Sequence, residues 1–221
     1  MGGDEFLQET IVRDGAFRRR PRGCRMPRFA NPARYSRNML DAARFENADR
    51  KLIQIVDAAL AVSAQVCGPR LACRAGCCDC CKGPFLITRL DARRLAAGLK
   101  ELQASDAARA AAVGERARSA ARREQGDDEP CPALDPESGR CELYAARPIT
   151  CRVFGPPMRE GDGPVGLCDL CFAGSPEEEI AACAMEIPGS ELESGLVAEL
   201  EAATGLAGET TVALALAGGC G

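Results

Sequence analysis

The chain has 221 residues, of which 14 are cysteine and none is histidine, and its formal net charge is −4. The absence of histidine excludes Ser-His-Asp and Cys-His catalytic sets, zinc fingers with histidine ligands and histidine–carboxylate iron sites. Aromatic residues are only 4% of the sequence and tryptophan is absent, so we expect something besides apolar burial to stabilise the fold.

Residues 1–44 show no sustained periodicity and are predicted to form a basic, disordered arm. Nine arginines lie between Arg13 and Arg37 against one acid, Asp14, and three prolines interrupt them. Such an arm can contact nucleic acid, but with interspersed prolines it is more often a solvated tail, so we do not expect a nucleic-acid partner. The N-terminus lacks the apolar segment of a secretory signal, and no apolar run approaches the length of a membrane span. We therefore predict a cytoplasmic protein without a membrane partner.

Residues 45–221 are predicted to form one mainly α domain. Apolar residues at helical spacing predict an amphipathic helix over residues 45–66, which Gly68 and Pro69 end. Thr88 and Asp91 have the spacing of a helix cap and predict that a helix begins after Thr88. The Ala and Arg content of residues 105–124 predicts a further helix that mostly faces solvent. The buried stripe expected in the first helix comprises Leu52, Ile55, Val56, Ala59, Leu60, Ser63 and Val66.

The rest of the domain is predicted to contain loops, short helices and little or no regular sheet. Residues 131–172 are dense in proline and glycine, which favour turns. Ser175 and Pro176 precede three glutamates and predict a helix start, and another helix is expected after Ser190. Residues 83–88 are expected to be extended, and the segment "TTVALALA" fits either a strand or a helix.

The cysteines are the strongest functional signal. Five lie within "LACRAGCCDCCKGPF", residues 71–85, and five more lie between residues 131 and 171. Repeated C-x-x-C pairs in Gly- and Pro-rich sequence are typical of metal sites, because two thiolates of one turn can converge on one ion. The other four lie in the arm, near expected helix ends or at the C-terminus and are set aside: Cys24, Cys67, Cys183 and Cys220.

Adjacent cysteines suggest more than one metal position. The side chains of Cys80 and Cys81 are expected to diverge, so that they serve two metals or two irons of one cluster. A single zinc site needs only four sulfurs, so this many cysteines favour at least two centres or a polynuclear one. Arg147 and Arg152 lie next to cysteines and are candidates to compensate the negative charge of a thiolate-bound cofactor.

Three competing interpretations fit less well. The spacing of Cys73, Cys77 and Cys80 matches the cluster loop of radical S-adenosylmethionine enzymes, but no succession of β/α units is present, and Asp79 stands where an aromatic is common. A disulfide scaffold requires export. A thiol oxidoreductase would place one C-x-x-C beside a βαβ pattern, which is not evident.

The order "CRAGCCDCC" followed by "CPALDPESGRCELYAARPITCRVFG" resembles the YkgJ-like cysteine-cluster family, described as a zinc- or iron-chelating domain. The family pattern is C-x₃-C-x₂-C-C, then Cys-Pro, Cys-x-x-Tyr and Arg-Pro-x-x-Cys-Arg, and the resemblance covers about residues 71–155. It implies metal binding, and Cys78 fits no position of the family pattern. The Cys168/Cys171 pair lies beyond the resemblance and is added as a ligand pair because of its C-x-x-C spacing. The expected metal ligands are Cys73, Cys77, Cys80, Cys81, Cys131, Cys141, Cys151, Cys168 and Cys171.

We therefore predict a metal-binding protein that holds iron–sulfur clusters or Zn²⁺ through thiolates, with a slight preference for iron–sulfur. Its partners would be metal ions and a protein redox partner. Two alternatives remain open. One is an iron–sulfur-dependent redox enzyme, although no catalytic set stands out. The other is a zinc-stabilised interaction module whose basic arm binds nucleic acid.

Overall fold

The computed structural model describes residues 32–123 and 125–218, with side chains from residue 41 onward. The chain divides into two units, residues 1–40 and residues 41–221. Of the first unit, only the helical residues 32–40 are described. The predicted disorder of residues 1–31 therefore lies outside the described residues. The elements in chain order are α1 (Pro32–Cys67), η1 (Gly68–Arg70), β1 (Leu86–Thr88), α2 (Arg89–Ser105), α3 (Ala107–Ala121), η2 (Tyr144–Ala146), α4 (Ile149–Val153), β2 (Met158–Arg159), β3 (Val165–Gly166), α5 (Glu177–Cys183), β4 (Met185–Glu186), α6 (Ser190–Thr204), β5 (Glu209–Thr211) and α7 (Val212–Leu216).

The first helix is longer than predicted, because α1 begins at Pro32 rather than at residue 45. Proline is tolerated in the first helical turn, and the following Ala, Arg, Met and Leu residues are good helix formers. Of the expected stripe, Leu52 and Val56 are fully buried, whereas Val66 is 62% exposed. The buried face ends instead on Cys67, one residue beyond the predicted helix.

One helical stretch, Asp41–Arg70, is long and apolar enough to cross a membrane by length and composition. The expectation that no segment would reach this length is therefore wrong. Between Leu52 and Pro69 only Asp57 is charged, which is why the stretch passes such a test. One face of this stretch, which includes Leu52 and Val56, is buried within residues 41–221.

Helices α2, α3 and α7 enclose the first apolar core. Thr88 caps α2 as predicted, and its Oγ1 accepts a hydrogen bond of 3.1 Å from the backbone N–H of Asp91. As predicted, most of α3 is not buried, but one face made of small residues, including Val113 and Ala117, packs into this core. Small side chains let the helices approach closely. This core includes Ile87, Leu95, Val113, Ala117, Leu143, Val212 and Leu216.

A second apolar core lies between α1, α2, α4 and α6. It contains Leu52, Val56, Leu90, Ile149 and Leu196. Ile149 is the first residue of α4, the short helix that also carries Cys151, so this core fixes the position of one expected ligand.

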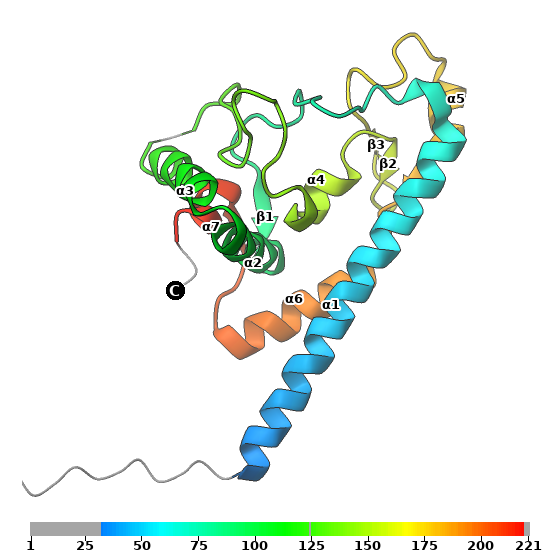
Figure 1. Cartoon of the computed structure of the whole chain (residues 1–221). Helices are drawn as coiled ribbons and strands as arrows, with labels where there is room; N and C mark the ends of the chain where they lie inside the picture. The colour runs from blue at the N-terminus through cyan, green and yellow to red at the C-terminus, as the bar shows by residue number, and fades with distance from the viewer. Residues whose placement is uncertain (1–31, 124, 219–221) are drawn as a thin grey trace, which may run out of the picture. The chain divides into compact units, whose positions relative to one another are not determined.

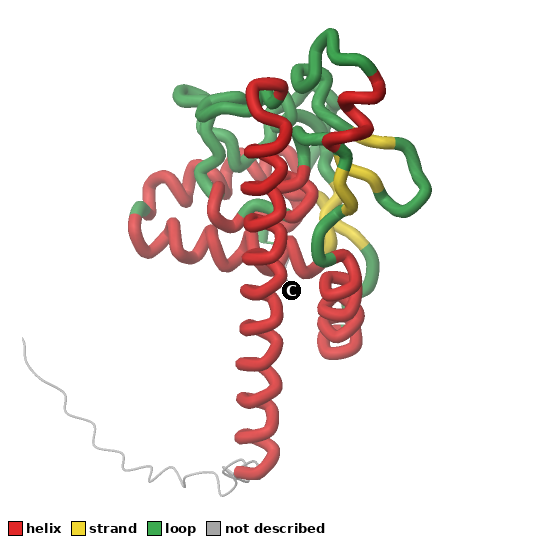
Figure 2. Tube along the Cα trace, turned by 90° about the vertical axis from the view of Figure 1, so that its right-hand side faces the viewer, coloured by secondary structure: helices red, strands yellow, loops and turns green. Residues whose placement is uncertain are grey.

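Regular sheet is limited to two small sheets in the described part of the chain, and the prediction of a mainly α fold is confirmed. β1 pairs with β5 in antiparallel register, Ile87 opposite Thr210, so the segment "TTVALALA" supplies both a strand and helix α7. β2 pairs antiparallel with β3 and parallel with β4. Figure 1 shows the helices that surround the first core, and Figure 2 shows the loops gathered on one side of the helices.

Candidate metal centre

The structure brings the expected ligands together in two sets. The first set joins the loop after η1 to the C-x-x-C turn after β3. Its members are Cys73, Cys77, Cys168 and Cys171. Burial, followed by the neighbouring Cys171, Cys168 and Cys77 thiols, raises the pKa of Cys73 to about 12.

Backbone turns position the first set. The N–H of Cys77 donates to the Arg74 carbonyl over 3.0 Å, and the N–H of Cys171 donates to the Cys168 carbonyl over 2.9 Å. Gly155 leaves room for the Cys73 sulfur, since a Cβ at this glycine would lie 2.8 Å from the sulfur. The site therefore has little space to spare around Cys73.

The second set joins the other end of the 71–85 loop to the segment 131–151. It comprises Cys80, Cys81, Cys131, Cys141 and Cys151. The N–H of Cys131 donates to the Cys81 carbonyl over 2.8 Å, and a β-bridge between Lys82 and Pro130 extends this contact. The two ends of the long α2–α3 excursion thus meet at the cysteines.

The thiols of the second set lie close enough to affect one another. Burial, then the Cys131 and Cys141 thiols, raises the pKa of Cys151 to about 12. Burial also raises the pKa of Cys131 to about 11, with Cys141 and Cys80 adding to the shift. Burial and neighbouring thiols therefore oppose loss of the proton at Cys73 in the first set and at Cys131 and Cys151 in the second.

Cys80 and Cys81 differ from the prediction. The pKa of Cys80 is raised, first by an interaction with the Cys81 thiol and then by burial. The two side chains therefore stay together in one set instead of diverging. The adjacent pair therefore gives no support to the expectation of more than one metal position.

The donor chemistry of both sets fits zinc or iron–sulfur, because both favour thiolates. Among the described residues, no group of three or more Cys, Asp or Glu side chains already converges as metal ligands. Metal binding would thus require the thiols to lose protons and their side chains to close in, which couples binding to the final ordering of the loops.

Arg152 has a structural role in the loop. Its buried guanidinium donates to the carbonyls of Arg147 and Ala145 and to Asp57 Oδ1, the last over 2.6 Å. Arg152 therefore holds the turn before α4 and links it to α1, and its donors are occupied by protein acceptors.

Arg147 is better placed than Arg152 to compensate cofactor charge. Its guanidinium lies 3.9 Å from the centroid of the Tyr144 ring. Its Nε is buried without a hydrogen-bond partner. Burial raises the pKa of the Cys141 thiol, and the Arg147 charge lowers it by a smaller amount. On balance, the pKa of Cys141 is raised.

A buried ionic network fixes α4, and the sequence analysis missed it. Asp91, only 1% exposed, accepts a hydrogen bond of 3.1 Å from the N–H of Ile149 and one of 2.5 Å from Arg94. Arg94 also donates to Asp49 on α1 over 2.9 Å. The sequence marked Asp91 only as an acid in the first turn of a helix.

Two cysteines that the sequence analysis set aside belong to the cysteine-rich core. Cys67 is fully buried and packs with Cys168, Cys171 and Phe172, and Cys183 packs against this cluster. Cys78 lies outside both sets, its sulfur 3.9 Å from where a Cβ at Gly139 would be.

A surface pocket of about 310 Å³ lies between the two sets. Cys80 of the second set and Cys168 of the first both line it, together with Phe154, Leu170 and two carboxylates. Phe154 and Leu170 are 42% and 46% exposed, so the pocket opens on a partly apolar surface.

The metal-free protein is expected to lose stability as the pH rises above about 9. Unfolded thiols lose their protons near 9.0, whereas folded Cys131 and Cys151 keep theirs until about 11 and about 12. Between these values the unfolded state binds fewer protons, so each of the two thiols removes about 1.4 kcal/mol of unfolding free energy per pH unit. Urea unfolding of reduced, metal-free protein between about pH 8 and about pH 10 measures this slope. Cys151→Ala should reduce the slope and Cys78→Ser should preserve it; an equal slope in Cys151→Ala would contradict the expectation.

Comparison with known proteins identifies a family for part of the chain. Residues 72–165 match the family profile CxxCxxCC, described as "Putative zinc- or iron-chelating domain". This match confirms the resemblance found from the cysteine pattern. The family name spells two residues between its first two cysteines, whereas this chain has three between Cys73 and Cys77. No curated protein and no solved structure matches the chain.

Proposed function

We propose that this protein, whose residues 72–165 match the profile of a zinc- or iron-chelating domain, holds two separate metal centres. The first centre would use Cys73, Cys77, Cys168 and Cys171. The second would use Cys80, Cys81, Cys131, Cys141 and Cys151.

One observation carries this proposal. Nine thiols from distant parts of the chain gather in two partly buried groups, and neighbouring thiols help to raise the pKa of Cys73 in the first group and of Cys131 and Cys151 in the second. Burying so many thiols without a cation gains little, because sulfur packs no better than a methyl group and the thiols are weak hydrogen-bond donors. Replacing their protons with a divalent metal satisfies all of them at once.

The two sets favour different occupants. Four thiols complete the tetrahedral shell of one metal ion, as in the first set. The second set contains the adjacent cysteines Cys80 and Cys81, which can bind separate irons of one cluster, and Arg147 places a positive charge near Cys141. We therefore propose an iron–sulfur cluster in the second set.

An iron–sulfur cluster supplies one-electron transfer when it is bound. The chain's own contribution is to bury the sulfurs, to hold α4 through Asp91 and Arg152, and to set the local charge through Arg147. We therefore propose that the protein transfers electrons to or from a protein redox partner.

Anaerobic purification followed by metal and sulfide analysis tests the proposal. Cys168→Ser/Cys171→Ser should remove only the metal of the first set, and Cys131→Ser/Cys141→Ser should remove iron together with sulfide. Cys78→Ser is the matched control and should change neither. Protein that contains zinc and no sulfide would overturn the iron–sulfur assignment, and protein in which each double variant loses all metal would overturn the two separate centres.

A further inference from the structure

Cys67 and Cys183 form a second kind of cysteine site. Cys67 is the last residue of α1 and is fully buried, and Cys183 is the last residue of α5 and is partly exposed. Both belong to one packed cluster. Burial, then the neighbouring Cys67 thiol, raises the pKa of Cys183. Figure 1 shows α5 beside the C-terminal end of α1.

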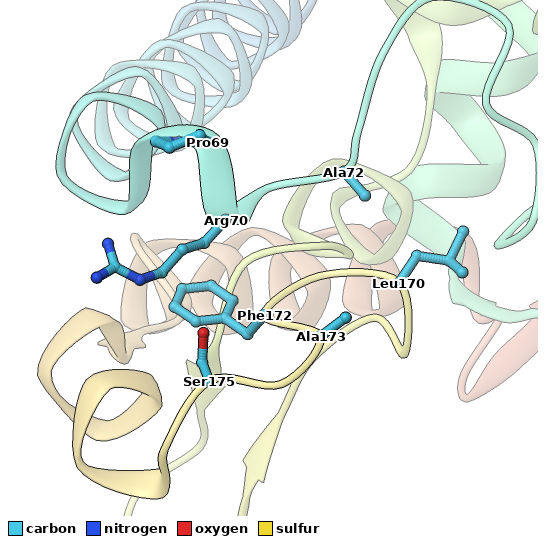
Figure 3. A pocket seen from close by; sticks show the side chains of 7 residues that line it. All are labelled: Pro69, Arg70, Ala72, Leu170, Phe172, Ala173 and Ser175. Atoms are coloured by element: carbon cyan, nitrogen blue, oxygen red, sulfur yellow. The ribbon is translucent and has the colours of Figure 1, made fainter.

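Two contacts hold these helix ends together independently of the cysteines. Arg70, in the turn that follows α1, forms an ion pair of 2.7 Å with Glu179 of α5. The N–H of Phe172 donates to the Arg70 carbonyl over 2.8 Å. Figure 3 shows Arg70 and Phe172 lining the same pocket, about 290 Å³ in volume. The two sulfurs are therefore held near each other by their surroundings.

The pair lacks the further ligands that a metal needs. The near polar partner of Cys67 is the Ser63 hydroxyl, 3.4 Å from its sulfur, and a neutral hydroxyl is a poor ligand for a soft metal. The nearby carboxylate of Glu179 is engaged by Arg70. Cys168 and Cys171 pack in the same cluster, but the first metal set uses these two thiols. Two neighbouring thiols that neither metal set uses are suited to disulfide chemistry.

We propose that Cys67 and Cys183 are a reversible redox pair that forms a disulfide while the two metal sets stay ligated. A small-molecule disulfide such as oxidised glutathione is the oxidant. The Cys183 sulfur, which solvent reaches, attacks one glutathione sulfur; the glutathione disulfide breaks, and one glutathione leaves with the proton from Cys183. The Cys67 sulfur then attacks the Cys183 sulfur and displaces the second glutathione, which takes the Cys67 proton. Two protein thiols are oxidised, and one glutathione disulfide is reduced to two thiols.

The disulfide would close a loop that contains every expected metal ligand, because all nine lie between residues 67 and 183. Closing a long loop removes conformational freedom from the unfolded chain. The oxidised pair would thus keep the fold together around the ligands when metal leaves.

The test uses metal-loaded protein equilibrated anaerobically in buffers with a rising ratio of oxidised to reduced glutathione. Free thiols are then trapped with an alkylating agent in acid, and peptides are identified by mass spectrometry. Cys67 and Cys183 should convert together from alkylated thiols to one linked peptide pair that lacks two hydrogen atoms. Cys67→Ala should stop at a glutathione adduct on Cys183, and Cys183→Ala should leave Cys67 unmodified because it is buried.

Cys78→Ser is the control and should titrate like the unaltered protein. Cys67 and Cys183 that stay alkylated at every ratio, or that link to other cysteines instead of each other, would overturn the proposal. Metal content is measured on each sample, so failure of the two metal centres is seen separately. Linkage of Cys67 to Cys183 that appears only in samples that have lost metal would also overturn the proposal, because the pair is proposed to close while the two sets stay ligated.

Discussion

Removal of the metal is expected to lower the free energy of unfolding by on the order of 5 kcal/mol while most of the helical circular-dichroism signal persists. The two sets connect the 71–85 loop to segments after residue 130. In the described residues the sheets have only two and three strands, so no large sheet holds these loops together without the metal. Metal-binding energy in such sites is also folding energy. Metal-free protein should therefore melt at a lower temperature.

The helices are expected to survive because two apolar cores do not depend on the metal. Leu95, Val113 and Leu216 lie in the first core, and Leu52 and Leu196 lie in the second. The third buried cluster, by contrast, consists mainly of cysteines. Loss of metal should consequently loosen the loops first and the helices α2 and α3 last.

Hydrogen exchange before and after metal removal measures where the loosening occurs. Backbone amides of residues 73–81, 131–141 and 168–171 should lose protection, and those in the middle of α2 should keep it. Restoring the metal anaerobically is the control for irreversible damage. Unchanged melting and unchanged exchange in the loops would show that the cysteines do not bind a stabilising metal.

The sequence predicted the elements that depend on local signals. Thr88 and Asp91 predicted the start of α2, and the three glutamates after Pro176 predicted α5, because caps and first-turn charges act within a few residues. The start of α1 was missed, since a helix that bears no clear apolar periodicity over its first turns gives no such signal. The buried face of α3 was missed as well, because its alanines bury as readily as they face solvent.

The ligand residues were predictable from spacing, but their grouping was not. C-x-x-C spacing indicates that Cys168 and Cys171 share a turn, and nothing in it indicates that Cys73 lies beside them. That proximity depends on how distant loops pack. Cys67 was set aside for the same reason: its lack of a C-x-x-C partner hid a contact with Cys183, more than a hundred residues away.

Replacing Asp91 with alanine is expected to destabilise the protein by about 3–5 kcal/mol. The change leaves the Arg94 guanidinium, 8% exposed, with only Asp49 as a partner. It also removes the acceptor for the N–H of Ile149. A buried charge that loses its partner and a buried N–H without an acceptor both carry a desolvation cost.

Asp91→Asn separates these two costs. The amide oxygen of asparagine can still accept from Ile149, so this variant loses only the charge and should be destabilised less than Asp91→Ala. Glu115→Ala is the matched control, because it removes an exposed ion pair with Arg118 and should change stability by less than about 0.5 kcal/mol. Urea unfolding of the three variants gives the comparison.

A readout at the second metal set distinguishes a role in positioning from a general loss of stability. Asp91 fixes the start of α4, and Cys151 lies two residues beyond Ile149. In metal-free Asp91→Ala, Cys151 should react with an alkylating agent faster than in the unaltered protein. Cys73 of the first set should react at the same rate, because the hydrogen bonds and ion pairs of Asp91 go to Thr88, Arg94 and Ile149 and not to the loop that carries Cys73. Equal acceleration at both cysteines would mean that Asp91 stabilises the whole unit and does not specifically hold the helix that presents Cys151 to the second set.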